Sequence, residues 1–150
     1  MGRHLHRRAF VAALMAVTLS ACGEPIAPPA LAMRFEITRE SLDEIESALS
    51  GYASRNRYKF ETFQGPIDRS FSLHNERMRI EMGAGAWNEP AYNTHEWPFE
   101  YQVDFYPADR SVNLDALAGE MGSLLAAIEG VRKSGPNFVP DKGDSEPASP

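Results

Sequence analysis

The sequence predicts an α+β domain: an antiparallel sheet of four to five strands with two helices packed on one face. Two observations predict this fold class. Apolar residues recur at helical spacing in residues 42–52 and again in residues 114–131. Between these stretches, three or four segments alternate apolar and polar residues, as strands with one buried face do. The expected order is therefore strand, helix, a run of strands and a final helix.

A strand and a helix open the predicted domain. Residues 33–37 alternate apolar with polar side chains and predict a short strand. Ser41, followed three residues later by Glu44, has the form of a capping box, in which both side chains pair with backbone donors at a helix start. The helix that follows carries an apolar stripe made of Leu42, Ile45, Leu49 and Tyr52.

The middle of the chain predicts the run of strands. Residues 58–63 are rich in aromatic residues and alternate weakly, and a turn follows at residues 64–66. The next strand starts near Phe71. The apolar parity then changes before residues 78–82, which predicts a turn or bulge at residues 74–76.

The clearest strand and the clearest helix come last. Residues 99–105 alternate regularly, and Pro107 ends that strand. Asn113 is a good N-cap for the helix after it. We expect this helix to continue until Gly135 and Pro136, with an apolar stripe made of Leu114, Leu117, Met121, Leu124, Leu125, Ile128 and Val131. The whole order is ferredoxin-like in general shape, an analogy that says nothing about activity.

Proline-rich segments flank the predicted domain. Residues 22–32 contain three prolines and few charges, which is typical of a semi-extended tether. Residues 134–150 contain four prolines and few apolar residues, so they predict a disordered tail. We therefore expect one domain, residues 33–133, that folds on its own.

The N-terminal residues have the pattern of a secretory signal peptide. Three arginines precede an apolar run that is about half the length of a membrane-spanning helix. The run ends in Leu19-Ser20-Ala21-Cys22. This motif resembles the lipobox of bacterial lipoproteins. Cys22 is also the only cysteine in the chain, so an exported thiol has no intramolecular disulfide partner.

The resemblance implies a lipid anchor and a location. It implies that residues 1–21 are removed and that Cys22 carries diacylglycerol and an N-terminal acyl group such as palmitate, which together hold a protein on a bilayer better than one chain does. Gly23 at the next position implies, in a Gram-negative cell, sorting to the periplasmic face of the outer membrane. The remaining 129 residues carry a net charge of −9. This charge argues against nucleic acid as a partner.

Motifs for catalysis and cofactor binding are absent from the sequence. It contains no Gly-x-Ser-x-Gly elbow, no Ser-x-x-Lys motif and no phosphate-binding loop, so we expect no cofactor. His74, Glu76, His95 and Glu96 lack the spacing of a metal site, and we read them as solvated loop residues. Paired carboxylates could come from Glu81, Glu100 and Asp104, for which ion pairs with Arg77 and Arg79 are the expected arrangement.

One aromatic segment is the candidate binding surface. Residues 83–98 hold Trp87, Tyr92 and Trp97 with almost no aliphatic residues. A connection of this length inside a compact domain is often functional, and Trp and Tyr are favoured at binding hot spots. The alternative is that these rings fold back and cover one end of the sheet.

Together these observations favour a non-catalytic, lipid-anchored envelope lipoprotein whose domain binds another envelope or periplasmic protein. One alternative is an immunity lipoprotein that neutralises a periplasmic toxin. Another is a periplasmic cell-wall hydrolase, which a cleft with two carboxylates of perturbed pKa would favour.

Overall fold

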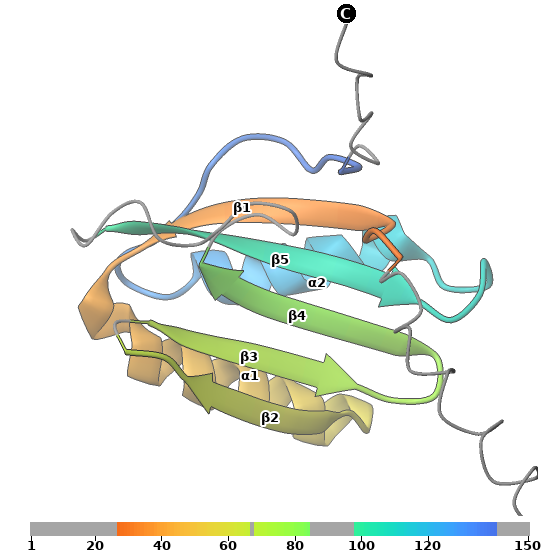
Figure 1. The fold of residues 1–150 in the computed structure, drawn as a ribbon, viewed down its shortest axis with the longest axis horizontal. Coiled ribbons are helices and arrows are strands. Elements are labelled where there is room, and N and C mark those ends of the chain that lie inside the picture. Colours follow the sequence, from red (N-terminus) through yellow and green to blue (C-terminus); the bar gives the residue numbers. More distant parts are fainter. Residues whose placement is uncertain (1–26, 67, 85–97, 141–150) are drawn as a thin grey trace, which may run out of the picture.

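The computed structural model describes residues 27–66, 68–84 and 98–140. The chain has the α+β architecture that the sequence predicts, with one sheet and two helices (Figure 1). Its elements, in chain order, are β1 (Leu31–Ile37), a short 3₁₀ turn (Arg39–Ser41), α1 (Leu42–Asn56), β2 (Lys59–Gln64), β3 (Arg69–His74), β4 (Met78–Ala84), β5 (Phe99–Pro107), α2 (Leu114–Ala126) and β6 (Val131–Lys133).

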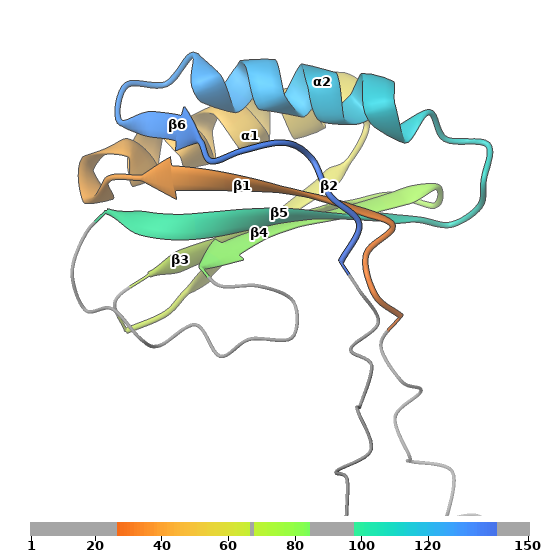
Figure 2. The ribbon, with the colours of Figure 1, turned by 90° about the horizontal axis from the view of Figure 1, so that it is seen from above.

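The sheet is antiparallel between all neighbouring strands, in the order β2-β3-β4-β5-β1-β6. Both helices lie on one face of it, and none of the described residues forms a helix on the other face (Figure 2). The core fills the space between the helices and this face of the sheet, because every second residue of each inner strand points toward the helices. Its largest fully buried side chains include Tyr101, Phe35, Phe71, Phe105, Met33, Ile45 and Leu125.

The sheet has six strands, so the prediction of four to five is wrong, and the missed strand is β6. The last helix ends at Ala126, and Gly130, with a φ of +79°, turns the chain back onto the sheet. Val131 then pairs with Ile37 of β1. Val131 is buried in β6, as it would have been on a longer helix, so apolar spacing alone could not reveal the helix end. Arg132 and Lys133 consequently lie in a strand, and the predicted helix stop at Gly135 is also wrong.

Two helix starts were predicted from cap residues, and one prediction is confirmed. The Asn113 side chain accepts a hydrogen bond from the backbone N–H of Ala116, as an N-cap does. Ser41 does not form the predicted capping box. Its hydroxyl instead donates to the carbonyl of Thr38 at 2.7 Å, because the 3₁₀ turn already places Ser41 in helical backbone geometry.

The folded region is longer at both ends than residues 33–133. At the N-terminal end, β1 begins at Leu31, and the N–H of Ala30 donates to Phe105 of β5. At the C-terminal end, Ser134 donates to Arg34, and Phe138 exchanges two backbone hydrogen bonds with Ala32. The predicted tail therefore begins with residues that hydrogen bond to β1, while residues 141–150 lie outside the described part of the chain.

The ferredoxin-like analogy covers only part of the topology. A β-α-β-β-α-β chain has one hairpin between its helices, whereas this chain has a meander of four strands, β2 to β5, in that position. The meander enlarges the helix-free face of the sheet.

Candidate functional site

The helix-free face of the sheet is polar. In β5, the odd-numbered residues Tyr101, Val103 and Phe105 lie in the core, so the even-numbered residues point to the opposite face. Strand register places Glu81 of β4 directly opposite Asp104 of β5, and Gly83 opposite Gln102. This polar face, which neither described helix covers, is therefore available as a surface for binding.

A hollow of about 280 Å³ lies on this face, over β3, β4 and β5. Small residues make it possible: Ser70 and Ser72 on β3 and Gly83 on β4 have little or no side chain to fill the space. Phe63 of β2, opposite Ser70 in the register, lines the hollow and is 54% exposed. We call this feature the sheet hollow, and its polar lining consists of Ser70, Ser72, Glu81, Gln102 and Asp104.

Two buried polar side chains of β5 line the sheet hollow. Gln102 is 3% exposed and Asp104 is 8% exposed. The Nε2 group of Gln102 donates to Oδ1 of Asp104 at 2.7 Å. No group among the described residues hydrogen bonds to Oε1 of Gln102, although that atom is buried. A buried acceptor without a partner costs free energy in the folded protein and is a feature that a ligand could correct.

The Asp104 carboxyl has an unusual acidity. Burial raises its pKa from an ordinary value of 3.8 to about 6. The hydrogen bond from Gln102 acts in the opposite direction, and the neighbouring charge of Glu81 raises the pKa further. Carboxyls with strongly shifted pKa values cluster at functional sites, although structural networks also produce them.

The three carboxylates singled out from the sequence have different surroundings. Glu100 pairs with Arg34 across the strands at 3.6 Å, and Glu81 pairs with Arg79 of its own strand at 3.3 Å. Both pairs are solvent-exposed and contribute little to stability. In the described part of the chain, Asp104 has no Lys or Arg partner, so the predicted arrangement of ion pairs is wrong for it. Arg77, expected near these groups, instead donates to the Ser111 hydroxyl.

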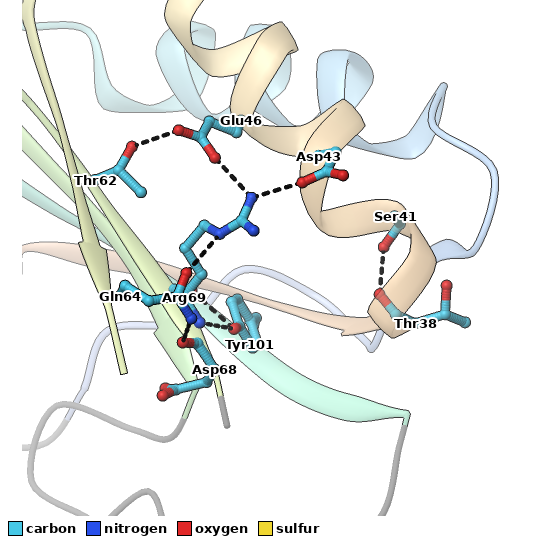
Figure 3. A network of polar contacts seen from close by, with 9 residues as sticks. All are labelled: Thr38, Ser41, Asp43, Glu46, Thr62, Gln64, Asp68, Arg69 and Tyr101. Carbon is cyan, nitrogen blue, oxygen red and sulfur yellow. Dashed lines mark hydrogen bonds and ion pairs between the residues drawn. The ribbon is translucent and has the colours of Figure 1, made fainter. Parts of the chain in front are cut away.

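A second polar network lies on the helix side of the sheet and is structural (Figure 3). One guanidinium nitrogen of Arg69 donates to Asp43 at 2.8 Å and to Glu46 at 2.7 Å, which fastens β3 to α1. The buried Tyr101 hydroxyl donates to the carbonyl of Arg69 and accepts from its N–H. These contacts join β3 to α1 and to β5, so we assign the network a structural role.

The predicted site residues fall mostly outside the described structure. Cys22 precedes the described residues, and Trp87, Tyr92 and Trp97 lie in the undescribed segment 85–97. His74 is in β3 and Glu76 in the turn after it, while His95 and Glu96 belong to the undescribed segment. Among the described residues, no group of three or more His, Cys, Asp and Glu side chains could hold a metal ion.

Most residues of the sheet hollow were not predicted from the sequence. Glu81 and Asp104 were among the predicted carboxylates, whereas Phe63, Gln102 and the small residues between them were not predicted. One sequence feature could have indicated the hollow: the residues at outward positions of two successive strands are small, namely Ser70, Ser72 and Gly83.

Comparison with known proteins adds no relative: no family model matches the chain, and neither the curated proteins nor the solved structures contain a match. Within the described residues, no helix is both long enough and apolar enough to cross a membrane.

Proposed function

We propose that this chain is a lipid-anchored lipoprotein of the bacterial envelope whose domain binds another envelope or periplasmic protein. The lipobox Leu19-Ser20-Ala21-Cys22 supports the anchor, and Gly23 supports the periplasmic face of the outer membrane in a Gram-negative cell. Trp87, Tyr92 and Trp97 belong to the proposal as partner contacts, since their segment connects β4 and β5, the strands that carry most of the sheet hollow.

The observation that carries the binding role is the sheet hollow. It combines an exposed aromatic ring, Phe63, with buried polar groups that the described fold leaves incompletely paired, Gln102 and Asp104. A partially exposed aromatic side chain beside desolvated polar groups is the composition of a binding hot spot. A buried acceptor without a partner lowers the stability of the fold, and this cost supports a role in which a ligand pairs with it.

Site-specific photo-crosslinking tests this proposal in cells. A photoreactive phenylalanine analogue replaces Phe63 in the sheet hollow, and a matched control replaces Ser123, which is exposed on α2 at the opposite face. We expect one discrete adduct from position 63 and none from position 123. The captured protein is then purified, and Phe63→Ala should weaken its binding at least about tenfold. Adducts from position 123 alone, or no adduct from either position, would contradict the proposal.

A second candidate function is a periplasmic cell-wall hydrolase. The observation that favours it is the pair of carboxyls in the sheet hollow, Glu81 and Asp104, one of which has a pKa raised to about 6. Glycoside hydrolysis uses one protonated and one ionised carboxyl in this way. Release of soluble fragments from purified peptidoglycan, lost in both Glu81→Gln and Asp104→Asn, would establish this activity. Absence of any released fragment rejects it.

A further inference from the structure

The polar lining of the sheet hollow is dominated by hydrogen-bond acceptors. Glu81 and Asp104 contribute carboxylate oxygens, and Gln102, whose buried Oε1 has no partner among the described residues, also lines the hollow. The Gln102 amide nitrogen already donates to Asp104. The only other side-chain donors in the lining are the hydroxyls of Ser70 and Ser72. A complementary ligand must therefore supply donors.

The negative charge of the sheet hollow favours a ligand whose hydrogen-bond donor is positively charged. Glu81 and Asp104 are directly opposite each other on adjacent strands, an arrangement that is unfavourable for two ionised groups. Arg79 approaches Glu81 at 3.3 Å, whereas no Lys or Arg in the described part of the chain pairs with Asp104. A bound cation would relieve the repulsion between the two carboxylates and would also meet the aromatic ring of Phe63 at the side of the hollow.

Three cation or donor classes differ in how well they match this lining. A primary ammonium has three donors and no acceptor, which matches Glu81, Asp104 and Oε1 of Gln102. A divalent metal ion favours more oxygen ligands than two carboxylates and one amide supply. A sugar presents donors and acceptors together, and its acceptors would meet mostly other acceptors here.

We infer that the sheet hollow binds a primary ammonium group, the side chain of a lysine of the partner protein. That the lysine belongs to a partner protein rests on the proposed function. The ammonium site itself can be tested without the partner. The buried and unpaired Oε1 of Gln102 is the observation, independent of the two carboxylates, that points to a ligand.

The test is an NMR titration of the purified, isotope-labelled protein with Nα-acetyl-lysine N-methylamide. We expect saturable shifts of the Gln102 side-chain amide and of Gly83. Asp104→Asn should weaken binding about tenfold, since it removes a charged hydrogen-bond acceptor. The matched control is Glu100→Gln, which makes the same charge change on the same strand. Glu100 pairs with Arg34 and does not line the hollow, so this variant should retain the wild-type affinity.

Neutral and alternative probes complete the test. Nε-acetylation removes the charge of the probe and should abolish binding. Four outcomes would each overturn the inference. The acetylated probe could bind as tightly as the lysine probe, or Glu100→Gln could lose as much affinity as Asp104→Asn. Methyl glucoside or calcium could bind more tightly than the lysine probe, or the lysine probe could give no saturable shift. A crosslinked partner at position 63 together with no lysine binding would reject the ammonium site alone. Lysine binding without any crosslinked partner would reject the proposed function alone.

Discussion

Replacing Asp104 by Asn should make the protein more stable at neutral pH, although it removes a group that we place in the binding site. The rise of the Asp104 pKa from 3.8 to about 6 means that the folded protein holds this proton more tightly than the unfolded chain does. The free energy of unfolding therefore falls as pH rises through that window. Each pKa unit corresponds to about 1.4 kcal/mol, so the ionised carboxyl costs up to about 3 kcal/mol above pH 6.

Asparagine has nearly the same shape and no charge, so Asp104→Asn should recover much of this free energy. Its carbonyl can still accept the hydrogen bond from Gln102, and its amide can donate to the unpaired Oε1 of that residue. The charged neighbour of Asp104 is Glu81, directly opposite on β4, whose own partner is Arg79.

Urea denaturation at two pH values measures the effect. We expect Asp104→Asn to be more stable than the wild type by about 1–3 kcal/mol at pH 7.5 and equal to it at pH 4, where Asp104 is also neutral. The control Glu100→Gln should change stability by less than about 0.5 kcal/mol. A loss of stability in Asp104→Asn at pH 7.5, or the same difference at both pH values, would refute the reasoning.

Three further predictions concern the anchor, the core and one helix end. Cys22→Ser should abolish labelling with radioactive palmitate and leave unprocessed precursor; undiminished labelling would reject the anchor. Leu125→Ala should lower the free energy of unfolding by about 2–5 kcal/mol and Leu124→Ala by clearly less, because Leu125 is fully buried and Leu124 only half-buried. Equal losses in a thermal or urea melt would contradict the finding that α2 turns Leu125, and not Leu124, into the core. Arg57 ends α1 at a φ of 59°, so Arg57→Gly should stabilise the fold by about 0.5–1 kcal/mol, and a destabilised variant would show that the arginine side chain stabilises this helix end.

The sequence predicted a helix or a strand correctly wherever the spacing of its apolar residues fitted only one of these two structures. The alternation in residues 99–105 and the spacing of Leu42, Ile45 and Leu49 each predict a single apolar face, and the structure buries the apolar residues of both faces in the core. Ile128 and Val131 continue the helical spacing, but Ile128 lies after the end of α2 and Val131 lies in β6. Both are buried, so the spacing of apolar residues could not distinguish a longer helix from a helix, a turn and a strand. The positive φ at Gly130 was the deciding feature. Leu124, a member of the predicted stripe, is only half-buried, because the buried face of α2 consists of Ala118, Met121 and Leu125.

The candidate site was less predictable than the fold. Phe63, Gly83 and Gln102 are distant in sequence, and only the pairing of β2 to β5 brings them to one hollow. A polar residue at an outward strand position normally predicts a solvated side chain. The burial of Gln102 and Asp104 is therefore a property of the assembled sheet and not of either residue's local sequence.

The central claim is that Asp104 is a buried carboxyl with no Lys or Arg partner among the described residues, in a site that a ligand cation completes. The most direct measurement is the pKa of this carboxyl, followed by carbon-detected NMR with and without saturating Nα-acetyl-lysine N-methylamide. We predict a pKa near 6 in the free protein. Bound ammonium favours the ionised form, so the pKa should fall toward its ordinary value when the probe is present. A pKa near 3.8 in the free protein, or a raised pKa that the saturating probe leaves unchanged, would contradict the account.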